Sequence, residues 1–378
     1  MKQVCNIKDC TGCSACVQVC PKNCIKMLSD KKGHIISVID EKECVNCGQC
    51  SKVCPVNNNP TFNFPKKCYA AWATNEKTRK NCSSGGIATV LSEYFINNGG
   101  IVYGCASLKN LDFKHIRVDN VKDLELLKGS KYVYSKCEDI YIKIKQDLLN
   151  NKQVLFIGTP CQNAGIINYI GKNEHLYMVN LICHGVPSLQ MLRESISSKI
   201  DINNFYSMSF RDGHEFKMKY QNLNKETITI CDFSKVRWEN YYYEGFFRQI
   251  IFRKSCYNCF FAKAERIGDI TIGDFWGIGK KEKFEYSIKK GCSVCLINTD
   301  RGQFLFDNVK NSINFYERNI NEAIEGNPQL RRPSKQNYNA KIFNFLYPKI
   351  GFNNSVKISC FERFFKYKIQ KIVKGISK

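Results

Sequence analysis

The fold of the first part of the chain is decided by the stretch Cys10-Thr11-Gly12-Cys13-Ser14-Ala15-Cys16-Val17-Gln18-Val19-Cys20-Pro21. Its cysteines recur as Cys44, Cys47, Cys50 and Cys54, and Pro55 repeats Pro21. The spacing C-x2-C-x2-C-x3-C-P is typical of bacterial ferredoxins with two iron–sulfur clusters, in which the fourth cysteine of each run binds the other cluster. We therefore expect one [4Fe-4S] cluster on Cys10, Cys13, Cys16 and Cys54, and a second on Cys44, Cys47, Cys50 and Cys20.

The alternative for these eight cysteines is a pair of zinc sites. Zinc ribbons use separate cysteine pairs rather than eight cysteines in this order, so clusters are favoured. Gly12 and Gly48 lie inside the cysteine loops, where backbone amides must approach sulfur closely. Residues 25–28 and 35–39 are predicted to form two short strands, which makes residues 1–59 an α+β ferredoxin-like dicluster domain. Cys5 and Cys24 fall outside the repeat, and Cys24 is expected to be a small core residue.

The composition limits what the remainder can be. The chain has 378 residues, 22 of them cysteine, and a net charge of +23. A hydrophobic content of 43% excludes disorder for most of it, and the length allows two or three domains. No apolar run approaches the length of a membrane span, and the N-terminal residues lack the apolar core of a signal peptide. We therefore expect a cytoplasmic protein, in a reducing compartment where spaced cysteines bind metals rather than form disulfides.

Residues 60–67 contain two prolines and are predicted to be a linker. Strand and helix signals then alternate, which predicts a larger α/β domain over residues 68–330 with its chemistry at the strand ends. The predicted strands are residues 69–73, 101–103, 115–118, 154–157 and 176–182, and the predicted helices are residues 87–95, 121–128 and 139–149. Residues 201–250 carry weaker signals, and their aromatic residues Trp238 and Tyr241 to Tyr243 are expected in a core or interface.

Four cysteines of the larger domain are candidates for a third tetrathiolate site. Cys161 and Cys183 each follow a predicted buried strand, while Cys256 and Cys259 form a C-x2-C pair in a predicted loop. Spacing alone supports this set weakly, because only one pair is local, and zinc or plain buried cysteines are the alternatives. A second C-x2-C pair, Cys292 and Cys295, lies in a predicted strand, where residues three apart face opposite sides.

Six short segments follow one another in a fixed order. They are SSGGI at 83–87, KGSKY at 128–132, GTPCQ at 158–162, LICHGVP at 181–187, SCYNC at 255–259 and GDITIGDFW at 268–276. Together they resemble the beta subunit of coenzyme F-420 (deazaflavin) hydrogenases and dehydrogenases, over about residues 68–302, with the ferredoxin repeat fused in front. Cys82 and the Cys292/Cys295 pair are departures from that family.

The resemblance implies FAD and a further [4Fe-4S] cluster. Its cluster ligands correspond to Cys161, Cys183, Cys256 and Cys259, and its flavin site to Ser84, Gly85, Gly86, Gly129, Ser130, Lys131 and Tyr132. Two glycines that open a helix leave amides and the positive dipole end for a pyrophosphate, and Lys131 would add a positive charge. The alternative is that Ser84 caps the helix and the glycines only allow a turn. No GxGxxG follows a strand, so a Rossmann nicotinamide site is not supported.

The function implied is that of an iron–sulfur flavoprotein oxidoreductase. Electrons would pass between an external carrier, the two ferredoxin-type clusters, the third cluster and FAD, and a substrate that accepts or donates hydride. The carrier would be an acidic protein such as ferredoxin, or the deazaflavin coenzyme. No catalytic residue is assigned. His184 follows a cluster ligand and either makes a hydrogen bond that supports the cluster site or acts as a general acid, and Asp269 and Asp274 are flavin contacts or turn residues.

Two other functions stay open. One is a non-catalytic module that relays electrons to a partner enzyme, and bacterial relatives suggest surface-polysaccharide synthesis as its setting. The other is a membrane-docked assembly factor whose clusters are structural.

Residues 331–378 form a basic C-terminal tail with 12 Lys and Arg and a single acid, Glu362. A helical apolar stripe is formed by Phe361, Phe365, Ile369, Ile372 and Ile376, and the lysines Lys366, Lys371, Lys374 and Lys378 lie mostly off it. This basic amphipathic helix would dock on an anionic membrane surface, dock on an acidic carrier, or pack as an ordinary terminal helix. No nucleic-acid-reading motif is present, so no nucleic acid is expected.

Overall fold

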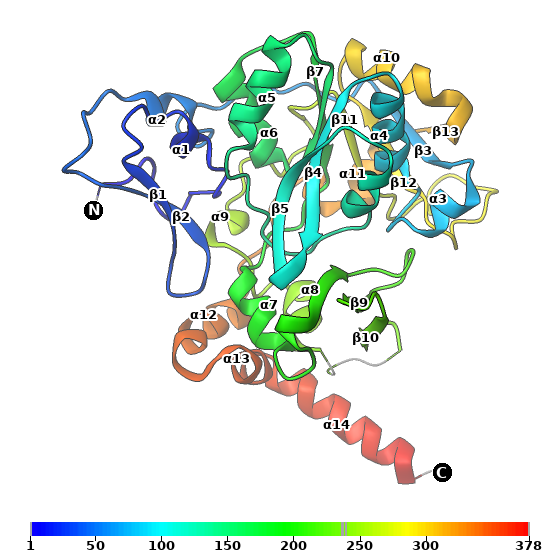
Figure 1. The fold of residues 1–378 in the computed structure, drawn as a ribbon. Helices are drawn as coiled ribbons and strands as arrows, with labels where there is room; N and C mark the ends of the chain where they lie inside the picture. Colours follow the sequence, from blue (N-terminus) through cyan, green and yellow to red (C-terminus); the bar gives the residue numbers. More distant parts are fainter. Residues whose placement is uncertain (1, 236–237, 239, 377–378) are drawn as a thin grey trace.

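The computed structural model describes residues 2–235, 238 and 240–376 (Figure 1). At the N-terminus, the antiparallel hairpin β1 (Ile25–Ser29) and β2 (Ile35–Ile39) lies beside the short helices α1 (Ala15–Gln18) and α2 (Gln49–Val53). Both predicted strands are confirmed. Each helix begins after a left-handed residue, Ser14 (φ 68°) or Gly48 (φ 75°), which turns the chain sharply out of a cysteine loop.

The larger domain is built on an eight-stranded sheet with the order β13-β3-β12-β11-β7-β6-β4-β5. Its central strands β4, β6, β7 and β11 are parallel, whereas β5, β12, β3 and β13 pair antiparallel with their neighbours. The centre of the sheet therefore has the parallel strands expected of an α/β domain, and the antiparallel strands on either side make the sheet as a whole mixed. The strands are β3 (Lys67–Ala73), β4 (Ile101–Leu108), β5 (Asp112–Val118), β6 (Val154–Gly158), β7 (Leu176–Leu181), β11 (Ile270–Asp274), β12 (Ser293–Ile297) and β13 (Ile313–Arg318).

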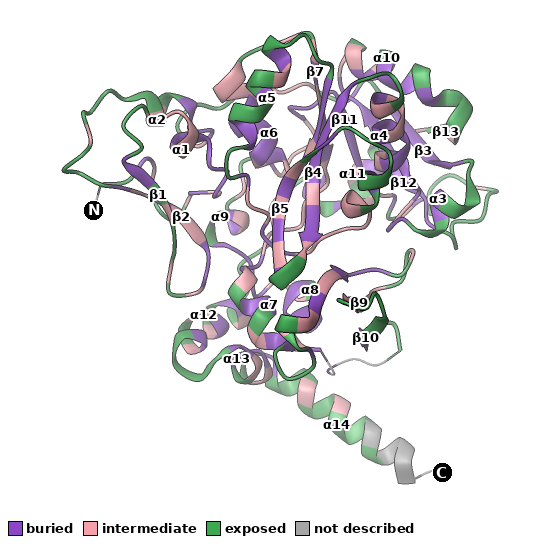
Figure 2. Ribbon diagram, in the orientation of Figure 1, coloured by how far each residue is buried: buried purple, intermediate pink, exposed green. Residues whose placement is uncertain are grey.

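Helices cover both faces of this sheet (Figure 1). One face packs against α4 (Ile87–Asn97) and α10 (Asp300–Val309), and the other against α5 (Ile140–Leu149), α6 (Pro160–Ile170) and α11 (Ile320–Gly326). Because both faces are covered, the central strands are apolar along nearly their whole length, as β6 illustrates. The labelled central strands β4 and β7 are largely buried in Figure 2. Cys292 and Cys295 lie in the core clusters of opposite faces, as predicted for a strand.

Residues 121–128, which were predicted to be helical, form a short 3-10 helix, Lys122–Leu127, in which only Leu124 is buried. With a single buried side chain, the segment has no apolar face that would hold a longer α-helix against the sheet.

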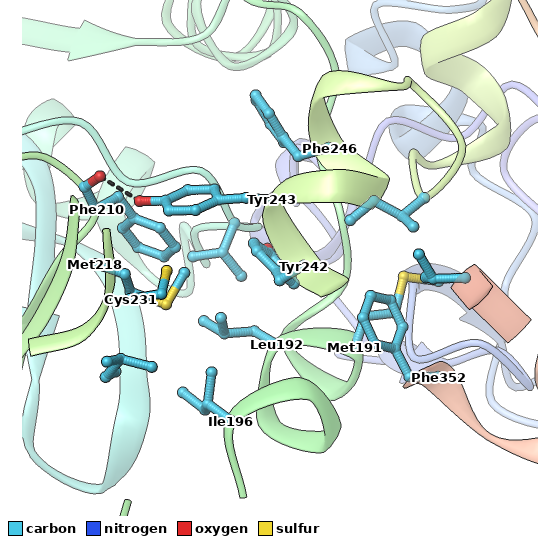
Figure 3. Packing of buried hydrophobic residues seen from close by; sticks show 14 of the residues in the cluster. Met191, Leu192, Ile196, Phe210, Met218, Cys231, Tyr242, Tyr243, Phe246 and Phe352 are labelled. Carbon is cyan, nitrogen blue, oxygen red and sulfur yellow. Dashed lines mark hydrogen bonds between the residues drawn. The ribbon is translucent and has the colours of Figure 1, made fainter. Parts of the chain in front are cut away.

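A second layer of structure lies beside the sheet and was weakly marked in the sequence. It contains the antiparallel strands β8 (Phe205–Ser209), β9 (Lys217–Asn222) and β10 (Thr227–Asp232), with helices α7 (Leu189–Ile196), α8 (Tyr241–Phe247), α12 (Tyr338–Ile350) and α13 (Phe352–Ser359). These elements share one core, in which Leu192, Tyr242, Tyr243 and Phe352 lie close together (Figure 3). Trp238 is also buried there, in agreement with its predicted core position.

The basic C-terminal segment divides into two parts. Helices α12 and α13 bury Phe343, Tyr347 and Phe352 in this core, so residues up to 360 are part of the folded body. Helix α14 (Phe361–Ile376) then extends away from it (Figure 1). The short helices α3 (Glu76–Lys80) and α9 (Lys254–Tyr257) complete the set. Of the helices that the structure describes, none combines the length and apolarity that a membrane span needs.

Candidate functional site

The structure brings together the first predicted set of cysteines, Cys10, Cys13, Cys16 and Cys54. Cys10 and Cys13 lie on the loop that leads into α1, Cys16 lies in α1 itself, and Cys54 follows α2, which packs beside α1. All four are buried. Burial, together with the neighbouring thiols of Cys10 and Cys54, raises the pKa of Cys16 to about 12. Cys54 therefore joins the cysteines of the first repeat rather than those of its own.

The second predicted set lines a cavity of about 240 Å³ at the outer end of the N-terminal domain. Cys20 from the first repeat meets Cys44, Cys47 and Cys50 from the second, so the fourth cysteines are exchanged between the sets as expected. Cys24 is buried and also lines this cavity, with its sulfur 3.4 Å from that of Cys20. Cys47 is exposed to solvent.

The third candidate set surrounds a smaller cavity of about 50 Å³ in the larger domain. Its lining contains all four predicted cysteines, Cys161, Cys183, Cys256 and Cys259. Cys161 lies in the first turn of α6, directly after β6, and Cys183 follows β7. Because β6 and β7 are adjacent and parallel, their carboxyl ends bring these two residues together. Cys256 belongs to α9, and burial raises its pKa to about 12.

A larger cavity of about 310 Å³ opens beside this set, at the carboxyl ends of β6, β7 and β11. Its lining includes six of the seven predicted flavin residues, namely Ser84, Gly86, Gly129, Ser130, Lys131 and Tyr132. Cys161 and Cys183 line it too, so the two cavities share part of their walls. The edge where parallel strands end is the usual ligand position in open α/β sheets.

Gly85 is the exception among the predicted flavin residues. Its amide donates a hydrogen bond to Ser293 Oγ at 2.9 Å. A Cβ at Gly85 would lie 2.2 Å from the carbonyl oxygen of Ala71, so only glycine fits against β3. Gly85 thus packs α4 against the sheet.

The residue that opens α4 is Gly86 (φ 85°), and no side chain caps the helix. The alternative that Ser84 is the N-cap is wrong, because its hydroxyl donates instead to the carbonyl of Cys292 at 3.0 Å. The first turn of α4 lines the large cavity through Gly86, Ile87 and Ala88. Its amides and the positive end of the helix dipole therefore face the cavity.

The two predicted flavin segments are joined by a hydrogen bond, in which the Ser130 amide donates to Ser83 Oγ at 2.7 Å. Lys131 has a different role from the expected free charge. Its ammonium donates to the carbonyls of Leu127 and Lys128, each at 2.8 Å, at the end of the 3-10 helix. Burial lowers the pKa of Lys131 to about 8.

Of the two aspartates, Asp274 lines the large cavity and Asp269 does not. Asp274, at the end of β11, lines the cavity and forms an ion pair with Arg211 at 3.1 Å. Arg211, which the sequence did not indicate, also donates to the hydroxyl of Tyr132 at 3.0 Å. Asp269 lies away from the cavity lining and accepts hydrogen bonds from the Met178 amide and the Thr299 hydroxyl, so it is structural.

His184 lines both cavities, where burial lowers the pKa of its imidazole.

The loop that carries Cys10 and Cys13 docks on the larger domain through residues that no motif indicated. The hydroxyls of Tyr134 and Tyr141 donate to the carbonyls of Gly12 and Cys13 at 2.7 and 2.8 Å. The carbonyl of Cys10 accepts from Arg253 at 3.3 Å and from Ser255 at 3.1 Å. These four donors hold the first cysteine set beside the third, and their only sequence signal is that Arg253 and Ser255 precede a C-x2-C pair.

Comparisons with known proteins match nearly the whole of this arrangement. Residues 9–58 match the 4Fe-4S dicluster domain. Residues 68–141 and 151–323 match the N-terminal and C-terminal parts of the coenzyme F-420 hydrogenase/dehydrogenase beta subunit. No curated protein matches. Among solved structures, a chain of the xenon-derivatised F-420-reducing [NiFe] hydrogenase complex from Methanosarcina barkeri is similar, with a TM-score of 0.47 and 17% identity over 76% of this chain and 95% of that one. The chain therefore belongs to the coenzyme F-420 hydrogenase/dehydrogenase beta-subunit family and carries an N-terminal 4Fe-4S dicluster domain.

Proposed function

We propose that this chain is an iron–sulfur flavoprotein oxidoreductase, with a third [4Fe-4S] cluster on Cys161, Cys183, Cys256 and Cys259 and FAD in the cavity beside it. Its family and its dicluster domain support iron–sulfur electron transfer of the oxidoreductase type. The observation that carries the finer proposal is the shared wall: Cys161 and Cys183 line both the small cavity and the large one. A cluster and a flavin in these cavities would be direct neighbours.

The third cysteine set fits a cluster in its chemistry. Four thiolates are the usual ligands of a [4Fe-4S] cubane, in which each sulfur binds a separate iron. Arg253 and Arg266 line the same cavity and would balance the negative charge of the thiolates. Burial lowers the pKa of Arg266 to about 10, which leaves it charged at neutral pH.

The lining of the large cavity supports a dinucleotide as its ligand. Its volume of about 310 Å³ lies at the lower end of the range usual for ligand pockets, and most of its lining is apolar. The uncapped first turn of α4 offers amides to a pyrophosphate. Arg211 holds two further lining residues, Tyr132 and Asp274, in place through the contacts described above. FAD, when bound, supplies the exchange between one-electron and two-electron chemistry.

The arrangement of the three cysteine sets supports the second set as the point where electrons enter or leave the protein. The second set is outermost, with Cys47 exposed. The first set lies on the larger domain, where Thr11, between Cys10 and Cys13, lines both the small and the large cavity. We infer that an external carrier, either an acidic protein such as ferredoxin or the deazaflavin coenzyme, exchanges electrons with this protein.

A matched pair of cysteine variants tests the third cluster. Cys256→Ser should lower the iron content of the anaerobically purified protein by about four atoms per chain, because a cubane needs its four thiolates. Cys295→Ser, in the other C-x2-C pair, should keep all the iron, since its buried thiol lies in a strand. A Cys256→Ser protein with undiminished iron would refute the third cluster.

A non-catalytic electron relay is the second candidate, and the exposure of Cys47 supports it as it supports the first, because both functions need an accessible cluster. The two functions differ in the large cavity: the relay needs no flavin there. Flavin release on denaturation, followed by absorbance and fluorescence, separates them.

A further inference from the structure

Helix α14 is held to the body of the protein along one side only. Phe364 packs against Trp238 with ring centroids 5.5 Å apart, and Phe364 and Tyr367 contact the core formed by α7, α8, α12 and α13. These contacts fix the start of α14 and its rotation about its own axis. The described residues beyond them project from the molecule (Figure 1).

The side of α14 turned away from these contacts is apolar and exposed. Phe361, Phe365, Ile369 and Ile372 are 60%, 53%, 44% and 60% exposed. Their spacing of four, four and three residues places them in one stripe, about 100° or more from Phe364 and Tyr367 on average around the helix. Exposed residues run along the described part of α14 in Figure 2. The side chains of Lys371, Lys374 and Ile376, and the residue Lys378, lie outside the described part.

Two lysines flank this stripe. At 100° per residue, Lys368 lies about 55° and Lys366 about 105° from the centre of the stripe, whereas Arg363 lies on the opposite side of the helix. Among the described residues, neither lysine is in an ion pair. The surrounding segment, residues 331–378, has 12 basic residues and one acid. An exposed apolar stripe with unpaired positive charges beside it is complementary to a flat anionic surface with an apolar interior.

We propose that α14 docks this protein on an anionic membrane surface. The stripe of Phe361, Phe365, Ile369 and Ile372 enters the level of the lipid headgroups, and Lys366 and Lys368 bind lipid phosphates. A membrane is favoured over a protein groove because the excess of 12 basic residues over one acid in residues 331–378 matches a surface that is anionic over its whole extent. The proposal is independent of the flavin and of the third cluster.

The test is flotation of the full-length protein with vesicles. Vesicles of phosphatidylcholine with about 30% phosphatidylglycerol should carry the protein upward, and phosphatidylcholine alone should carry much less, because each basic residue near an anionic surface contributes about 1 kcal/mol. Binding should weaken as salt is raised.

Two double variants separate the charge from the stripe. Lys366→Gln with Lys368→Gln should weaken binding about thirtyfold, which is about 2 kcal/mol at 1.4 kcal/mol per tenfold. Phe361→Ser with Phe365→Ser should weaken it by at least about tenfold through lost apolar burial. All four positions are on the surface helix, so circular dichroism and iron content should be unchanged.

The matched control is Lys152→Gln with Lys172→Gln, which removes the same charge from exposed positions of the larger domain. It should leave flotation within about twofold of the unaltered protein, since these lysines are off the docking surface. Equal losses in both lysine pairs would show a non-specific charge effect and overturn the proposal. The proposal would also be overturned if flotation did not depend on the charge of the lipids, or if the protein bound poly-glutamate but not vesicles. A dimer that dissociates in the Phe361→Ser with Phe365→Ser variant would overturn it as well.

Discussion

Arg253 and Ser255 provide a quantitative test of how the two domains are joined. The Arg253 side chain is buried, and its Nη1 donates to the carbonyls of Ile35 at 2.5 Å and Cys10 at 3.3 Å. Ser255 Oγ donates to the same Cys10 carbonyl at 3.1 Å. The guanidinium also lies 5.2 Å from the ring of Tyr134. Two side chains of the larger domain thus share one acceptor in the first cysteine loop.

The expected cost of Arg253→Met follows from these contacts. Loss of the short charged bond to Ile35 costs about 1.5–3 kcal/mol, and the longer bond and the ring contact add about 1 kcal/mol. The change also removes Nε and Nη2, which are buried without a hydrogen-bond partner among the described residues, so part of the cost is offset. We expect a net loss of about 2–4 kcal/mol, and about 1 kcal/mol for Ser255→Ala.

The double variant should cost more than the sum of the two. In either single variant the Cys10 carbonyl keeps one donor, whereas in the double variant it keeps neither of these two. A buried carbonyl without a partner costs about a further 1–3 kcal/mol. The free energy of opening, measured by native-state hydrogen exchange over residues 10–16, reports the three losses.

An exposed hydroxyl serves as the control. Ser197→Ala removes the exposed bond of Ser197 to the Glu194 carbonyl and should leave exchange over residues 10–16 unchanged. The reasoning would be refuted if the losses for Arg253→Met and Ser255→Ala added within about 0.5 kcal/mol, or if Arg253→Met left exchange in the loop unaltered.

Two further perturbations test the packing beside the large cavity at Gly85 and the titration of His115, which lines the cavity. Gly85→Ala should displace β3, because its Cβ would lie 2.2 Å from the Ala71 carbonyl oxygen; we expect at least about 1–3 kcal/mol of destabilisation and loss of bound flavin. Gly99→Ala, at φ 74° with no atom within 4 Å of its Cβ, should cost only about 1–2 kcal/mol of backbone strain and keep the flavin; equal flavin loss in both variants would contradict the packing role of Gly85. Burial lowers the pKa of His115 to about 4, below its unfolded value of about 6.5, so stability is full above pH 6.5 and falls by about 3 kcal/mol as pH drops to 4. In urea titrations across this range, His115→Gln should show a correspondingly smaller fall, and an unchanged pH dependence would show that His115 is not the titrating group.

The parts of the site that could be predicted from the sequence depend on local spacing. Three thiols on one tight loop are dictated by a few adjacent residues, so the first two cysteine sets and the hairpin between them were readable directly. The third set was not, because Cys161 and Cys183 meet only through the adjacency of β6 and β7. The third set was predicted instead from the ordered series of six segments, which indicated a family whose cluster ligands correspond to these cysteines. That family is confirmed.

Other features carry no periodic signal. Strand β10 is exposed over its first three residues, so it lacks the alternation that marks a half-buried strand. Helix α12 buries one apolar face, with Ala340, Phe343 and Tyr347, whereas α14 presents its stripe to solvent, and periodicity alone does not distinguish a stripe that packs from one that does not. Arg211 contacts Asp274, which is 63 positions away in the sequence, and Arg253 contacts Cys10, which is 243 positions away. No local pattern indicates contacts between residues so far apart.

The central claim is that three clusters and one flavin reside in a single chain. The most direct measurement is the content of iron, acid-labile sulfide and flavin in the anaerobically purified full-length protein. The proposed function predicts about twelve irons, about twelve sulfides and about one FAD per chain, from three cubanes and one occupied cavity. About eight irons with no flavin would contradict both the third cluster and the flavin site, and would leave an electron-relay module as the function.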